Sequence, residues 1–139
     1  MAKYMLIMRG TDETMAKMMD TPMEQMLEVV GRYNEELIKA GVLVAAEGLD
    51  DPRQGVVVDF SGEAPVVTDG PYGETKELFG GFYLIDVASR DEAVEWARRL
   101  PPMGGAKCEV RRVSSIEDFP QDNEWIVKER AWRERTGQL

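Results

Sequence analysis

The sequence predicts an α+β fold in which two helices cover one face of an antiparallel sheet. Short β-branched runs alternate with longer segments whose apolar residues recur every three or four positions. The order is strand, helix, strands, strand, helix, strand, which contains two similar halves. A split βαβ, ferredoxin-like sandwich buries one sheet face under two helices. With 139 residues, of which 43% are hydrophobic, the chain is long enough for one core.

The first half begins with residues 3–9 (KYMLIMR), which are apolar on both alternating faces, as in a strand inside a sheet. A helix should follow, because Thr21-Pro22-Met23-Glu24 reads as a capping box with proline at the first helical position. Its apolar face takes in Met23, Met26, Leu27, Val30, Asn34, Leu37 and Ile38, and Gly41 should end the helix.

Three short strands are expected next, at residues 42–49, 55–60 and 64–69. They are rich in valine and separated by turn residues. We interpret them as neighbouring antiparallel strands.

The second half repeats the pattern of the first. Residues 80–87 (GGFYLIDV) predict a strand that is apolar on both sides, and Ser89-Arg90-Asp91-Glu92 again resembles a capping box. The helix that follows should end at Pro101-Pro102, and residues 106–113 form the last strand. Cys108 is expected to be a small core residue of that strand.

Two strands without a polar side imply that the second face of the sheet is also covered. A single helical layer leaves that face exposed, so a second subunit is the economical cover. The sequence therefore predicts a homodimer with facing sheets.

The tail, residues 114–139, is a C-terminal extension to a core domain of residues 1–113. Residues 123–135 (NEWIVKERAWRER) predict a helix whose acidic residues come early and whose basic residues come late. Trp125 and Trp132 lie seven positions apart, on one helical face. We expect an arm that docks these tryptophans onto its own domain or its partner; a recruitment helix for another protein is the alternative.

Composition excludes several classes of function. A net charge of −9 argues against binding to nucleic acid or an anionic membrane. The absence of histidine excludes Ser-His-Asp triads, Cys-His pairs and His-ligated zinc. The lone cysteine fits a reducing compartment, and without a signal peptide or membrane helix we expect a cytoplasmic protein that needs no metal or cofactor.

The methionines at positions 15, 18, 19, 23 and 26 suggest two interpretations. Soft thioether ligands suit Cu(I). An adaptable core and a flexible helix entrance explain the same residues without a metal, and this is the interpretation we adopt.

Four segments resemble the YCII-related family, and specifically its branch with a DGPF-type motif: KYMLIMRG, GVLVAAEGL, VTDGPYGETKELFGGFYLIDV and EAVEWARRLP. The resemblance covers the core to Val113 and implies a ferredoxin-like fold of the dimeric α/β-barrel type. Tyr72 stands where phenylalanine is usual, and Gly73 where alanine is common. A His-Asp pair proposed as catalytic in YCII relatives has no counterpart here, because the chain lacks histidine.

The segment TDGPYGETKE, Thr68 to Glu77, raises the question of a turn or a site. Turn chemistry explains Asp69, Gly70 and Pro71 fully. It does not explain the charged and phenolic side chains that follow, which suit a small polar ligand and proton transfer. The candidate catalytic residues are Asp69, Glu74 and Lys76, and the candidate ligand-binding residues in this segment are Gly70, Pro71, Tyr72 and Thr75.

Arg9 and Glu47 are further ligand-binding candidates, because each ends a predicted strand next to a glycine. Arg9 is expected either to bind a carboxylate or to form an ion pair at the rim.

The leading functional hypothesis is a small enzyme that catalyses proton transfer or isomerisation, with Asp69 or Glu74 as base and Lys76 or Tyr72 stabilising negative charge. The alternative is a non-catalytic ligand-binding or regulatory dimer.

Overall fold

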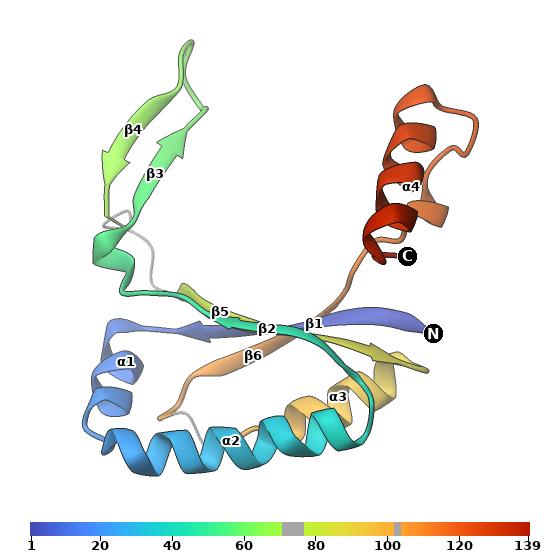
Figure 1. The fold of residues 1–139 in the computed structure, drawn as a ribbon. Helices are drawn as coiled ribbons and strands as arrows, with labels where there is room; N and C mark the ends of the chain where they lie inside the picture. Colours follow the sequence, from blue (N-terminus) through green and yellow to red (C-terminus); the bar gives the residue numbers. More distant parts are fainter. Residues whose placement is uncertain (71–76, 102–103) are drawn as a thin grey trace.

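A computed structural model describes residues 1–70, 77–101 and 104–139 and shows helices packed on one face of a four-stranded antiparallel sheet (Figure 1). The strands are β1 (Ala2–Gly10), β2 (Leu43–Gly48), β5 (Leu78–Val87) and β6 (Lys107–Arg112), in the order β2-β5-β1-β6. The two central strands, β1 and β5, belong to different halves of the chain. This α+β, ferredoxin-like arrangement is the one that the sequence predicted.

The covering helices are α1 (Asp12–Met19), α2 (Met23–Lys39) and α3 (Arg90–Arg98). The predicted capping box at Thr21 is wrong, because Pro22 is the N-cap of α2 and makes no side-chain cap hydrogen bond. A capping box instead opens α1, where Thr11 and Thr14 bond to each other's backbone amides. The sequence prediction missed α1 altogether. At α3 the predicted N-cap is confirmed, since the Ser89 hydroxyl accepts from the Glu92 amide at 3.2 Å, but the Glu92 carboxylate accepts from the Ala88 amide and so does not complete the capping box.

The core lies between the helices and the sheet. Its largest fully buried side chains are Leu6, Leu37, Ile85 and Val87, contributed by α2 and the two central strands. Each such side chain contributes roughly 1.5–3 kcal/mol on leaving water. Cys108 packs against this core and is half-buried, as predicted.

The middle of the chain differs from the prediction. Strands β3 (Val56–Asp59) and β4 (Val66–Asp69) pair with each other as expected, but they form a separate hairpin outside the main sheet. The short helix η1 (Pro52–Gln54) turns the chain out of the sheet after β2. As a result β2 pairs with β5 and not with β3.

Residues 114–139 contain the short helix η2 (Ile116–Asp118) and the predicted helix, α4 (Glu124–Thr136). Asn123 caps α4, and Gly137 ends it in the left-handed conformation that favours glycine. Trp125 and Trp132 are 69% and 45% exposed, so they do not dock onto their own domain. Across the described part of the chain, we find no helix with the length and apolar character that a membrane crossing requires.

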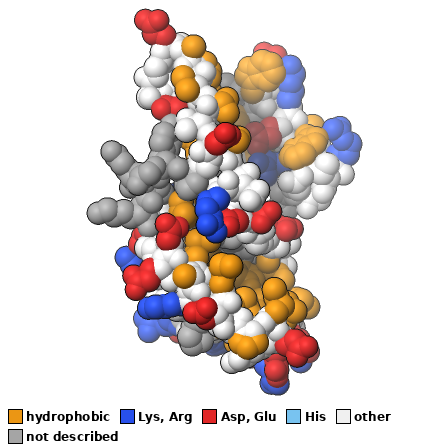
Figure 2. Space-filling view, turned by 90° about the vertical axis from the view of Figure 1, so that its left-hand side faces the viewer, with side chains coloured by type: hydrophobic (Ala, Val, Ile, Leu, Met, Phe, Trp, Pro, Cys, Tyr) orange, Lys and Arg blue, Asp and Glu red, His pale blue; other side chains and the backbone are white. Residues whose placement is uncertain are grey.

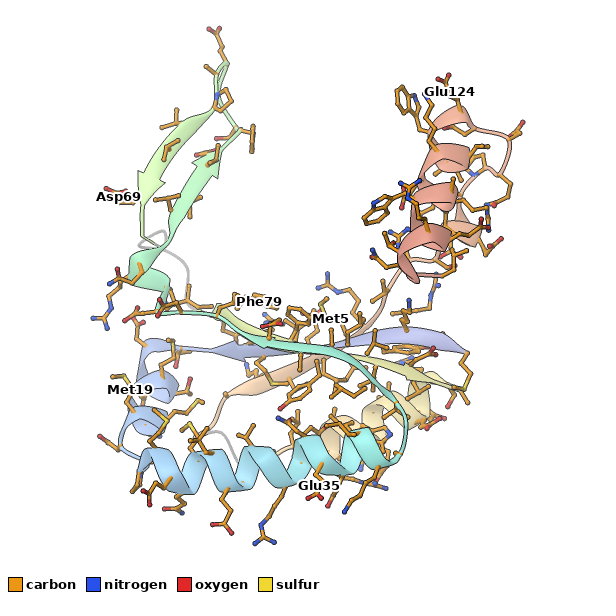
Figure 3. All side chains as sticks on the ribbon, viewed as in Figure 1. Met5, Met19, Glu35, Asp69, Phe79 and Glu124 are labelled. Carbon is orange, nitrogen blue, oxygen red and sulfur yellow. The ribbon has the colours of Figure 1, made fainter. Side chains whose placement is uncertain are left out.

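The face of the sheet opposite the helices is uncovered, and we call it the open face. Side chains alternate along a strand, so Met5, Ile7, Phe82 and Leu84 lie here while their neighbours enter the core. Figure 3 shows Met5 and Phe79 on this side. The hairpin and α4 rise from opposite ends of the open face, so the chain has the outline of a cradle (Figure 1).

Candidate functional site

The candidate site is a pocket between helices α1 and α2 and the sheet, which we call the helix–sheet pocket. Its volume is about 710 Å³. Pockets for small molecules have volumes of roughly 300–1,000 Å³. Most of its described lining is apolar and comes from α1, α2, β1, β2 and β5. The pocket is therefore large enough for a small organic molecule.

Methionines form much of this wall. Met8 comes from β1, Met15 and Met18 from α1, and Met26 from α2. In Figure 3, sulfur-containing side chains gather where α1 meets α2. Unbranched thioether side chains adapt to irregular ligands, so this wall can reshape around what it binds.

The methionines do not act as one cluster. Met19 and Met23 are largely exposed and lie outside the pocket lining. Within residues 1–70, 77–101 and 104–139 there is also no group of three or more His, Cys, Asp or Glu side chains that suits a metal ion.

A polar pair lies at the wall shared by α2 and β5. The Tyr83 hydroxyl donates a hydrogen bond of 2.7 Å to Oδ1 of Asn34, and both residues line the pocket. Burial raises the pKa of Tyr83, so its phenol is protonated and neutral at physiological pH. The Tyr33 ring packs edge-on against the Tyr83 ring at 5.4 Å and restricts its orientation. The pocket thus combines apolar walls with one fixed, uncharged hydrogen-bonding pair.

Charged residues stand around the pocket. Lys17, Glu47, Asp50 and Asp51 all contribute to its lining. Asp51 bonds to Arg53, with Oδ2 at 2.8 Å from the guanidinium. The hydrogen bonds from Arg53 hold the pKa of the Asp51 carboxyl below its usual range. Asp51 is therefore a carboxylate already engaged by a cation.

Arg9 belongs to an ion-pair network on the open face. Its guanidinium lies 2.6 Å from Glu77 and 3.3 Å from Glu109. Lys107 contacts Glu77 at 3.0 Å, and Arg111 pairs with Glu109. The hydrogen bond from Lys107, together with Arg9, lowers the pKa of Glu77. Arg9 is part of the lining of the helix–sheet pocket, but its guanidinium is already paired with the carboxylates of Glu77 and Glu109.

The predicted loop site is described only at its two ends. Asp69 is exposed at the end of β4, and the Gly70 amide donates to the Gly55 carbonyl at 2.7 Å. Gly70 has a φ of +71°, a conformation that favours glycine. The other candidates of this loop, Pro71, Tyr72, Glu74, Thr75 and Lys76, lie outside the described residues.

Both described ends of this segment lead to one hollow. A second pocket of about 360 Å³ lies at the base of the hairpin, and Gly55 and Leu78 are in its wall. At one end, the Gly70 amide bonds to Gly55 of this wall. At the other end, Glu77 directly precedes Leu78 of the same wall. Leu78 also lines the helix–sheet pocket, so the two hollows adjoin.

Sequence reasoning missed the most defined polar feature of the site. Asn34 was assigned only to the apolar face of a helix, and Tyr83 only to a strand. A signal was nevertheless available, because Asn34 is a polar residue at a position where the spacing predicts an apolar one. An amide on the buried side of a helix requires a partner, and here that partner is the Tyr83 phenol.

Comparison with known proteins gives two findings. A family model described as the YCII-related domain matches residues 2–117. An uncharacterized protein of Rhizobium meliloti (strain 1021) is 36% identical over 77 residues, which is 55% of this chain and 62% of the relative. The chain therefore spans less than two thirds of that relative's length.

Proposed function

The chain belongs to the YCII-related family, and from that premise we propose that it binds a small, partly apolar molecule in the helix–sheet pocket. The observation that carries the proposal is the pocket itself. It has a volume of about 710 Å³, a methionine-rich wall, and the Asn34–Tyr83 pair within its lining. A mostly apolar pocket with a few placed polar groups is the usual form of a ligand site.

The lining favours a ligand with an apolar ring and one hydrogen-bonding group. The ring would contact Met15, Met18 and Met26, and the polar group would face Asn34 and Tyr83. Thioethers pack well against aromatic rings, at a gain of about 0.3–1.5 kcal/mol. Because the polar pair is neutral, it suits an uncharged amide, hydroxyl or carbonyl better than a free ion.

We propose further that the ligand is a substrate and that the reaction is a proton transfer or isomerisation without metal or histidine. Asp69 or Glu74 would act as the base, and Lys76 or Tyr72 would stabilise the developing negative charge. The support is topological: the two described ends of the segment that carries these groups lie beside the hollow at the hairpin base, and that hollow adjoins the helix–sheet pocket.

A non-catalytic ligand-binding or regulatory protein is the second candidate. The neutral Asn34–Tyr83 pair favours it, because a protonated phenol and an amide can hold a ligand but supply no base. Turnover by the wild-type protein, lost in Asp69→Asn while binding persists, would decide for the enzyme.

Two finer assignments belong to the same proposal. The motif Asp69-Gly70-Pro71-Tyr72 supports membership of the DGPF branch. The lone Cys108 supports residence in the reducing cytoplasm. Burial, and then Glu109, raise the pKa of the Cys108 thiol to about 11, so it is a protonated, unreactive thiol.

We also propose that the protein is a homodimer with facing sheets. The open face presents Met5, Ile7, Phe82 and Leu84 at its centre, and the Arg9–Glu77–Lys107 ion pairs lie beside them. An apolar sheet face of this kind is normally covered in a folded protein.

The binding proposal is tested by ligand-induced thermal stabilisation. The probes are phenol, indole and benzamide, each an apolar ring with one hydrogen-bonding group. A ligand at 100 times its Kd stabilises the native state by about 2.7 kcal/mol. Val30→Trp fills the pocket and should abolish the stabilisation, whereas Leu27→Trp, on the same helix but 63% exposed and outside the lining, should preserve it. Equal responses in the two variants would contradict the proposal.

A further inference from the structure

The hairpin β3–β4 presents valine side chains that the described residues of its own chain leave exposed. A two-stranded hairpin alone is marginally stable in water. Cross-strand partners share one side of a ribbon, so Val58 and its partner Val67 lie on the same side as Val56. These side chains are 43%, 66% and 61% exposed. Figure 2 shows hydrophobic side chains along the projecting hairpin.

Helix α4 presents a second apolar surface. Trp125 and Trp132 lie seven residues apart and thus on one face, and both are exposed. Arg130 ties another side of the helix to its own chain through Glu117, at 2.8 Å. Lys128 lies over the Trp125 ring at 4.4 Å, and its ammonium also pairs with Glu124 at 3.0 Å.

The two surfaces differ in formal charge. The hairpin and its flanking turns, residues 55–70, contain Asp59, Glu63 and Asp69 and not one lysine or arginine. Helix α4 carries four cationic residues against three acidic ones. Like surfaces would repel each other and unlike ones attract, although each contact is worth little when fully exposed.

Dimer symmetry allows two ways of arranging these surfaces. The hairpin and α4 rise from opposite ends of the open face, on the side away from α1–α3 (Figure 1). Two such faces can meet about a two-fold axis that lies in the plane between them. If the axis runs along the line from the hairpin to α4, hairpin meets hairpin and α4 meets α4. If the axis is perpendicular to that line, the hairpin of each copy meets α4 of the other.

We propose that the second arrangement occurs: in the homodimer, the hairpin of each copy packs against the Trp125–Trp132 face of α4 in the other. This pairs apolar with apolar at both ends and sets the acidic hairpin against a helix that has one more cationic than acidic residue, whereas the first arrangement sets two acidic hairpins against each other. The inference rests on the proposed facing-sheet dimer and is independent of the ligand proposal.

The arrangement also fixes a direction. In each chain α4 begins far from the sheet at Glu124 and returns towards it at the C-terminus (Figure 3). In the inverted second copy the start of α4 points towards the first copy's sheet. Trp125 of one copy is thereby directed to the hairpin base of the other, beside the hollow lined by Phe79.

The test uses single cysteines in a Cys108→Ser background, which removes the native thiol. Val67→Cys marks the middle of the hairpin, and Glu129→Cys marks the tryptophan face of α4. The two chains are co-expressed with tags of different length and treated with a short bismaleimide. Each variant is also expressed and treated alone, and sedimentation is measured for every sample.

We expect a covalent dimer of mixed size in the co-expressed sample and little covalent dimer from either variant alone. Covalent dimers from each variant alone, with none of mixed size, would overturn the arm pairing and leave the facing-sheet dimer standing. A sedimenting dimer without any crosslink would also overturn the pairing. If the Cys108→Ser parent and the wild-type protein both sediment as monomers, the arm pairing and the facing-sheet dimer are both overturned.

Discussion

The Tyr83 hydroxyl on β5 and the Asn34 amide on α2, 49 positions apart in the chain, are joined by a hydrogen bond of 2.7 Å across the helix–sheet boundary. This bond ties the longest covering helix to a central strand at the wall of the pocket. It is therefore expected to matter both for stability and for binding.

Tyr83→Phe should destabilise the protein by about 1 kcal/mol, because it leaves the half-buried Asn34 amide without its donor. Chemical denaturation measures the change. Asn34→Leu is the companion variant, and the double variant should be more stable than the sum of the two effects by about 0.5–1.5 kcal/mol. Strict additivity would show that the bond contributes nothing.

Glu77→Gln should lower the free energy of unfolding by an amount that depends on pH. Lys107, and then Arg9, lower the folded pKa of Glu77 below its ordinary value of 4.5. A carboxyl with a lowered folded pKa stabilises the fold above its unfolded pKa, and this stabilisation disappears as pH falls through the folded value. The stability difference between wild type and Glu77→Gln should thus be greatest near neutrality and shrink in acid. Urea titrations between about pH 3 and pH 7 measure it; a difference independent of pH would contradict the assignment.

Ile7→Asp and Leu84→Asp should each abolish dimer formation, because a charge at the centre of the open face has no compensating partner there. Analytical ultracentrifugation distinguishes monomer from dimer. Leu27→Asp is the matched control: this leucine is 63% exposed on a covering helix, and the variant should remain dimeric. Intact dimers of both open-face variants would place the interface elsewhere.

Asp69→Asn and Lys76→Met should impair ligand binding or turnover more than folding. Asparagine keeps the turn geometry of Asp69 without the charge, and methionine keeps the apolar stem of Lys76 without the amine. Asp69 is exposed, so its substitution should change the free energy of unfolding by less than about 1 kcal/mol. Thermal unfolding and calorimetry with the stabilising probe check the two effects. Unfolding of either variant, or unchanged binding together with unchanged turnover in both, would make this segment structural.

The main sheet could be predicted because its strands obey local rules. Residues 3–9 and 80–87 are apolar on both sides, and the structure places them side by side as β1 and β5 at the centre of the sheet. The position of the hairpin could not be predicted in this way. A valine-rich run predicts a strand but does not say which sheet the strand joins. The turn that begins at Pro52 after β2 directs β3 and β4 away from the main sheet.

The candidate site was harder to predict than the fold. The polar pair depends on a contact between α2 and β5, and such a contact leaves no periodic signal in either segment. Helix α1 escaped prediction for a related reason: its charged and methionine residues leave it without a buried side chain, so it lacks the apolar stripe by which helices are recognised.

The most direct test of the ligand site is the NMR spectrum of the protein labelled at its methionine methyl groups, titrated with benzamide. The pocket wall contains Met8, Met15, Met18 and Met26, whereas Met5 lies on the open face and Met19 and Met23 are outside the lining. We predict saturable shifts of the four pocket methyls and unmoved signals from Met5, Met19 and Met23. Saturable shifts centred on Met5, or no shift with benzamide, phenol or indole at millimolar concentration, would contradict the account.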